Sequence, residues 1–147
     1  MEEVIQEEEI YEKDISPRER RSLIQARVGQ GEYREKLLDE CPFCPFTMVN
    51  DERLLIASHI KPWAKSTDKE KVNPKNGFAL TPTYDKLFDK GFITFVDEKK
   101  LIVSPWLSPM NQKRLNIYTG KIIEKLPLDE ERKVFLAYHR ENVFKGL

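Results

Sequence analysis

ASHIKPW at residues 57–63, NGFAL at residues 76–80 and YDKLFDKG at residues 84–91 form the most informative part of the chain. The apolar run over 54–60 is typical of a strand, which Pro62 ends, and 77–81 fits a second, short strand. Residues 83–90 then favour a short helix that Gly91 stops. The centre of the chain is therefore predicted to fold as a strand, a polar loop, a strand and a helix.

The sequence before this centre predicts two helices. Ser16 and Pro17 have the pattern of an N-cap followed by proline at the first helical position. Apolar spacing favours a helix over 18–28, which the glycines of 29–31 should interrupt, and a second helix over 32–40.

The sequence after the centre predicts one β-hairpin and two more helices. Apolar runs at 92–96 and 101–104 flank a charged turn, as in a hairpin. A short helix is expected over 109–115, and a longer one over 129–144, with Val134 among the residues available to pack. The fold class is α+β.

Composition and charge limit the possible classes of protein. The chain has 147 residues, 39% hydrophobic and 34% charged, which fits one domain over 16–147 after an acidic tail or linker over 1–15. Residues 1–14 carry a net charge of −6, so the rest carries +6, since the whole chain is neutral. A basic body is compatible with a polyanion partner, and an ordinary solvated surface is the alternative.

Membrane and secretion signals are not recognisable in the sequence. Its apolar runs are too short to span a bilayer, and the acidic start lacks the basic residues of a secretion signal. A cytoplasmic protein without a membrane partner is the expectation.

Four polar side chains in the centre suit one kind of chemistry. His59 ends the first strand, and Asp85 and Asp89 are four apart, so they share a helix face. Histidine titrates nearest neutral pH and suits a general base, whereas carboxylates suit a hard ion such as Mg²⁺ or Mn²⁺. An asparagine such as Asn76 can hydrogen-bond backbone across the loop. Phosphodiester hydrolysis needs such a base and such an ion.

The same residues resemble a known family. SHIKP at 58–62 and NG at 76–77 are similar to motifs of HNH endonucleases, in the restriction-type branch of the ββα-metal (His-Me finger) nucleases. Asp85 stands nine positions after Asn76, where that family has a metal ligand on its helix. Further resemblance comes from LFDKG at 87–91, RVGQG at 27–31, YR at 33–34 and YHREN at 138–142.

The resemblance implies roles for individual residues. His59 would be the general base, and Asn76 would hold the loop. Asp85 would bind a divalent ion, Mg²⁺ or Mn²⁺, with Asp89 and Ser58 as further candidate ligands. Many relatives have aspartate where this chain has Ser58, and histidine where it has Asp85. Asp89 has an alternative role as a cap or as the partner of a lysine.

DNA is the expected partner, and lysines near the centre are the expected contacts. Lys61, Lys65 and Lys75 lie in the polar loop of 64–75 or beside it, and Lys86 lies on the predicted helix. The alternative is simple solvated charge. Trp63 is expected in the core, with a base-stacking platform as the alternative.

Cys41 and Cys44 form one CxxC pair, which is half of a zinc site. We expect a structural role, as a buried or turn-forming pair. Zinc with outside ligands and redox chemistry are the alternatives. Relatives often have a second pair, at positions where this chain has Thr81 and Tyr84, so structural Zn²⁺ is not expected from the resemblance.

The sequence thus predicts a metal-dependent HNH endonuclease that hydrolyses DNA, related to restriction or defence. Recognition of a particular DNA sequence would come from a separate specificity domain or a homodimer, because no base-reading module is recognisable in this chain. One alternative is a catalytically inactive nucleic-acid-binding module of the same fold. Another is a structural or protein-interaction domain.

Overall fold

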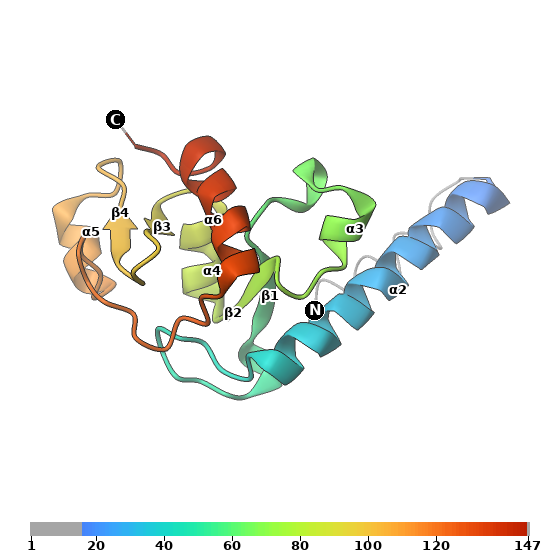
Figure 1. The fold of residues 1–147 in the computed structure, drawn as a ribbon, viewed down its shortest axis with the longest axis horizontal. Helices are drawn as coiled ribbons and strands as arrows, with labels where there is room; N and C mark the ends of the chain where they lie inside the picture. The colour runs from blue at the N-terminus through green and yellow to red at the C-terminus, as the bar shows by residue number, and fades with distance from the viewer. Residues whose placement is uncertain (1–15, 147) are drawn as a thin grey trace.

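The computed structural model describes residues 16–146, so the predicted tail over 1–15 lies outside the described residues. Helices alternate with two small antiparallel sheets, which confirms the α+β class (Figure 1). In chain order the elements are α2 (Pro17–Glu40), η1 (Glu52–Leu54), β1 (Ile56–His59), η2 (Trp63–Lys65), α3 (Asp68–Lys71), β2 (Gly77–Leu80), α4 (Pro82–Asp89), β3 (Ile93–Phe95), β4 (Leu101–Val103), α5 (Pro109–Arg114) and α6 (Glu130–Asn142).

α2 is one continuous helix of 24 residues, so the predicted interruption at 29–31 is wrong. Each glycine costs a helix only about 1 kcal/mol relative to alanine, and packing elsewhere on the helix offsets this. The buried residues Tyr33, Leu37 and Leu38 all belong to the C-terminal half. The N-terminal half projects from the body of the molecule (Figure 1).

β1 and β2 form the antiparallel hairpin at the centre of the molecule, with His59 opposite Gly77 and Ser58 opposite Phe78. Successive residues of a strand point to opposite faces. On one face the ring of Phe78 contacts Phe88 of α4, with centroids 5.8 Å apart. On the other face Gly77 lies against α2, because a Cβ there would be 2.4 Å from Leu37. His59 therefore faces α2, and Ser58 faces α4.

α4 follows β2 directly, as predicted, and packs across the hairpin. Pro82 is at the start of the helix, where a backbone N–H would have no hydrogen-bond partner within the helix, so proline costs nothing there. Gly91 follows the helix with a φ of +76°, in the left-handed region. A Cβ at Gly91 would also lie 2.1 Å from the Val143 oxygen, so both its conformation and its neighbour require glycine.

The segment between β1 and β2 is more ordered than the polar loop we expected. It contains η2 and α3, and α3 begins with a capping box in which Thr67 and Glu70 exchange hydrogen bonds. The expectation that Trp63 is a core residue is wrong, because its exposed fraction is 40%. The Lys71 ammonium lies 4.1 Å from the centre of the indole ring instead.

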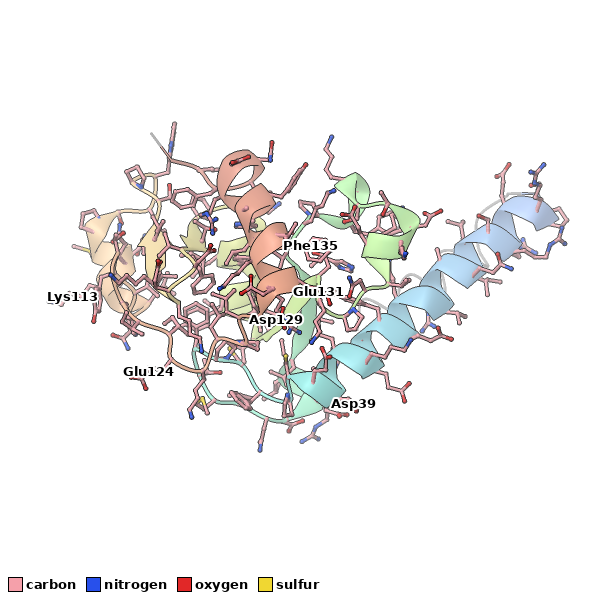
Figure 2. The ribbon with its side chains drawn as sticks, viewed as in Figure 1. Asp39, Lys113, Glu124, Asp129, Glu131 and Phe135 are labelled. Atoms are coloured by element: carbon pink, nitrogen blue, oxygen red, sulfur yellow. The ribbon has the colours of Figure 1, made fainter. Side chains whose placement is uncertain are left out.

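β3, β4, α5 and α6 complete the body, as predicted. α6 buries Phe135, Leu136 and His139 against it, and Phe135 is labelled in Figure 2. Val134, expected to pack, lies on the outer side of α6 with 70% of its surface exposed. Among the described residues, no helix combines the length and apolar character needed to cross a membrane.

Candidate active site

His59, the predicted base, is half-buried at the end of β1. Its Nε2 lies 2.8 Å from the backbone oxygen of Lys71. Because a carbonyl oxygen only accepts, Nε2 carries the hydrogen and Nδ1 keeps a lone pair. Burial lowers the pKa of the imidazole, and the bond to Lys71 partly opposes that effect. A neutral ring with one basic nitrogen is the form a general base requires.

Asn76 is fully buried and joins the two ends of the η2–α3 segment. Its Oδ1 accepts from the Lys61 backbone N–H at 2.8 Å. Its Nδ2 donates to the Ser66 hydroxyl at 3.3 Å and to the Glu70 backbone oxygen at 3.2 Å. Since Lys71 follows Glu70, these bonds fix the peptide next to the one that holds His59.

An ion pair reinforces the same segment. The Lys61 ammonium donates to Glu70 at 2.9 Å, and both side chains are largely covered. The Thr67 backbone N–H and the Lys61 ammonium lower the pKa of Glu70, which keeps the carboxylate charged. Lys61 also lies 5.0 Å from the ring centre of Tyr138 on α6. Lys61, predicted as a DNA contact, is therefore engaged within the protein.

The candidate metal ligands belong to α4 and to the face of the hairpin that α4 covers. Asp85 is half-buried in the first turn of α4, and Asp89 is exposed one turn further on. Ser58 is 5% exposed and offers only a hydroxyl. Asp89 also acts electrostatically on His139, whose pKa it tends to raise.

These oxygen donors fit a hard divalent ion. Within residues 16–146, no group of three or more His, Cys, Asp or Glu side chains is arranged to hold a metal. That is compatible with Mg²⁺, which one or two carboxylates commonly bind while water and phosphate fill the other positions. His59 and Ser58 point to opposite faces of the hairpin, and Asp85 and Asp89 belong to the helix that covers the Ser58 face. A shared site would therefore lie around the end of β1.

The other predicted DNA contacts differ in their surroundings. Lys75 pairs with Glu40 at 3.1 Å and with Asp129 at 3.4 Å, and the bond to Glu40 raises its pKa. Lys65 and Lys86 are exposed, on η2 and α4. Exposed lysines can reach a phosphate without giving up an internal partner.

Cys41 and Cys44 are both buried and both unoxidised. The Cys44 thiol lies 3.6 Å from the Thr81 hydroxyl, and Cys41 accepts a bond from Arg132 at 3.4 Å. The ring of Tyr84 stacks on Phe46, with centroids 4.3 Å apart. Thr81 and Tyr84 stand where many relatives have a second cysteine pair. Here Thr81 contacts Cys44 through its hydroxyl, and Tyr84 contacts Phe46 through its ring.

Two residues of this region were not predicted to belong to the site, although the sequence marked Tyr33 as part of the family resemblance. Tyr33 stacks on His59, with ring centroids 4.1 Å apart and planes 14° apart. Arg132 is 2% exposed and donates to the backbone oxygens of Gly77 and Pro74, at 3.0 and 3.2 Å. Arg132 stands three residues before Phe135 and so shares a helix face with it, but this spacing does not by itself indicate that an arginine is buried.

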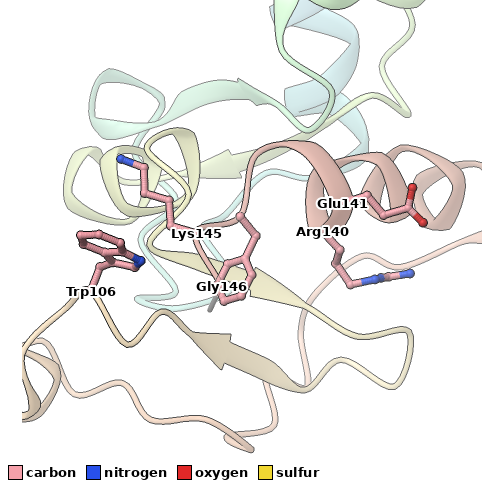
Figure 3. A pocket seen from close by; sticks show the side chains of 6 residues that line it. Trp106, Arg140, Glu141, Lys145 and Gly146 are labelled. Carbon is pink, nitrogen blue, oxygen red and sulfur yellow. The ribbon is translucent and has the colours of Figure 1, made fainter.

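A cavity of about 580 Å³ opens elsewhere, between the β4–α5 connection and the end of α6 (Figure 3). None of the predicted site residues lines it. Its lining consists of Trp106, Arg140, Glu141, Phe144, Lys145 and Gly146.

The hairpin, the helix packed on it and the buried asparagine together form a β–β–α unit, as the resemblance to HNH endonucleases implied. Residues 44–96 match the family model described as HNH endonuclease, which confirms the resemblance drawn from the sequence. The match takes in β1, β2, α4 and β3 but neither α2 nor α6. The matched segment is therefore similar to a family of nucleases, which are phosphodiester hydrolases. No curated protein matches the chain.

Proposed function

We propose that the protein is a metal-dependent HNH endonuclease that hydrolyses DNA, with His59 as the general base. The observation that carries this proposal is the bond from His59 Nε2 to the Lys71 oxygen. It leaves Nδ1 as the basic nitrogen on a half-buried, neutral ring. The match of residues 44–96 to a nuclease family supports the same chemistry.

In the proposed reaction, Nδ1 of His59 takes a proton from a water molecule as its oxygen bonds to phosphorus. The bond between phosphorus and the leaving oxygen breaks, and solvent protonates that oxygen. A bound Mg²⁺ or Mn²⁺ ion, held first by Asp85, would neutralise charge on the phosphate oxygens. Asn76 and Lys61 keep the Lys71 carbonyl in place, and Lys65 and Lys86 are the proposed phosphate contacts.

The test is plasmid cleavage by wild type and His59→Ala, each with Mg²⁺, with Mn²⁺ and with a chelator. Loss of a general base should lower the rate roughly 10²- to 10⁴-fold. Lys113→Ala is the matched control, because Lys113 lies on α5, at the far end of the molecule from α2 (Figure 2). Metal-dependent cutting by wild type and Lys113→Ala, but not by His59→Ala, supports the proposal. Equal rates in all three proteins contradict it.

The second candidate function is a nucleic-acid-binding module that does not cut. Ser58 favours it, because a buried hydroxyl is a weaker ligand than the carboxylate that many relatives have there. This function predicts DNA binding that weakens with salt and no cleavage with either ion. The same plasmids, examined by gel shift before and after incubation, distinguish the two functions.

We also propose that any restriction or defence role depends on a separate specificity domain or a homodimer. The described residues between 16 and 146 contain no helix-turn-helix or finger array that would read bases. Cleavage of unrelated DNA sequences at similar rates is the expected behaviour of the domain by itself. Strict sequence preference in the isolated protein would contradict this.

A further inference from the structure

We infer that Tyr33, from α2, is a positioning residue that fixes the plane of the His59 imidazole. The catalytic consequence of this inference rests on the proposed function, whereas the contact itself does not. Tyr33 lies outside the segment that matches the nuclease family.

The first observation is that two different contacts hold the His59 ring. The bond from Nε2 to the Lys71 oxygen fixes one edge of the ring. The stacked ring of Tyr33, 4.1 Å away and inclined by 14°, covers one face. An edge contact by itself leaves the ring free to tilt about the hydrogen bond. The stacked tyrosine limits that tilt, so Nδ1 keeps one direction.

The second observation is that Tyr33 is itself held rigidly. It is 2% exposed, and its hydroxyl donates to the Asn76 backbone oxygen at 2.7 Å. The same oxygen accepts from the Ile60 N–H at 3.4 Å, and Ile60 follows His59 directly. Tyr33 is therefore bonded to the hairpin at the position of the base, so both move together.

The third observation is that the hairpin makes room for this tyrosine. Gly77 is directly opposite His59 in the β1–β2 register. A Cβ at Gly77 would lie 2.0 Å from the Tyr33 hydroxyl oxygen and 2.4 Å from Leu37 Cδ1. The tyrosine thus occupies the space of a strand side chain on the face where His59 lies. Glycine at 77 is required by this close approach.

The positioning matters because proton abstraction depends on direction as well as distance. A misplacement of about 1 Å can cost roughly 10²-fold in rate. A base whose ring rotates between several orientations spends part of its time with Nδ1 turned away from the water. Tyr33 contributes no chemical group to the reaction, so its removal should affect turnover and leave DNA affinity unchanged.

The first experiment observes the imidazole directly, by NMR of ¹⁵N-labelled histidines. The chain has two histidines, so the spectra contain two imidazoles. In wild type, the stacked tyrosine should shift the His59 ring protons upfield, and the nitrogen shifts should report hydrogen on Nε2. Tyr33→Phe should keep both features, and Tyr33→Leu should lose the upfield shift. His139, stacked on Phe88 at 3.9 Å, is the internal reference and should not change.

The second experiment separates kcat from KM in DNA cleavage. Tyr33→Leu should lower kcat roughly ten- to a hundred-fold with KM unchanged, and Tyr33→Phe should restore most of it. Leu37→Ala is the matched control for stability, because Leu37 is buried one turn later on α2 and also packs beside Gly77. It should lower the melting temperature at least as much as Tyr33→Leu and leave kcat unchanged well below that temperature.

Each outcome decides the inference. Unchanged His59 signals in Tyr33→Leu overturn it, whatever the cleavage rates are. Altered signals with a kcat no lower than that of Leu37→Ala also overturn it, because the ring orientation then has no effect on turnover. If wild type cuts no DNA, the proposed function is wrong, and the spectra still decide whether Tyr33 stacks on the His59 ring.

Discussion

At the scale of single residues, the candidate site depends on which atoms each polar side chain has already engaged. His59 donates through Nε2 to the Lys71 oxygen. Asn76 accepts a hydrogen bond through Oδ1 and donates through Nδ2. Lys61 and Lys75 pair with carboxylates, although the sequence predicted both as DNA contacts. The types of these residues can be read from the sequence, but their partners cannot. Each lysine has several carboxylates near it in the sequence with which it could form an ion pair.

The two aspartates of α4 should differ as metal ligands. Asp85→Asn should raise the Mg²⁺ concentration needed for half-maximal cleavage by more than roughly ten-fold, since even outer-shell changes cost 10- to 100-fold in metal affinity. Asp89→Asn is the matched variant on the same helix and should have a smaller effect, because Asp89 is exposed. Cleavage rates over a Mg²⁺ titration measure both. The reverse order of effects would assign the ion to Asp89.

At the scale of elements, the sequence predicts best where a local signal marks both ends. α4 has proline at its start and Gly91 beyond its end, and it lies within a residue of its predicted range. The β3–β4 hairpin is marked in the same way, by two apolar runs around a charged turn. The prediction divided α2 into two helices, which is wrong, because glycine only weakly indicates a break in a helix whose C-terminal half is packed.

The continuity of α2 leads to a stability prediction. Gly31→Ala should raise the free energy of unfolding by about 0.5–1 kcal/mol, because alanine loses less entropy in a helix and the new Cβ would have no heavy atom within 4 Å apart from its chain neighbours and the backbone of its own helix. Gly77→Ala is the contrasting variant and should destabilise the protein, since its Cβ would meet Tyr33. Urea unfolding followed by circular dichroism measures both. A loss of stability in Gly31→Ala would indicate an interrupted helix.

At the scale of the whole molecule, His139 joins three elements. From α6, its Nε2 donates to the Phe88 oxygen of α4 at 2.9 Å, since a carbonyl only accepts. Its Nδ1 lies 2.9 Å from the Thr94 hydroxyl of β3 and accepts from it. Burial lowers the pKa of His139 to about 4, although the bond to Phe88 acts in the opposite direction. The neutral ring is therefore part of the packed core.

This buried histidine should make stability depend on pH. Between pH 6.5 and 4 the unfolded chain binds a proton at this position and the folded chain does not, so the free energy of unfolding decreases as the pH falls. The decrease from this group should be about 3 kcal/mol over that range. Urea midpoints at several pH values, for wild type and His139→Gln, measure it. An identical pH dependence in the two proteins would contradict the assignment to His139.

The α+β class and the order of the elements around the candidate site followed from the sequence, because they depend on neighbours along the chain. The spacing of His59, Asn76 and Asp85, the proline and glycine around α4, and the alternation in the strands are all local patterns. The contact of Tyr33 with His59, the exposure of Trp63 and the burial of Arg132 depend on tertiary packing. Helix and strand propensities act over a few residues, whereas the free energy of a side chain depends on what surrounds it after the chain has folded.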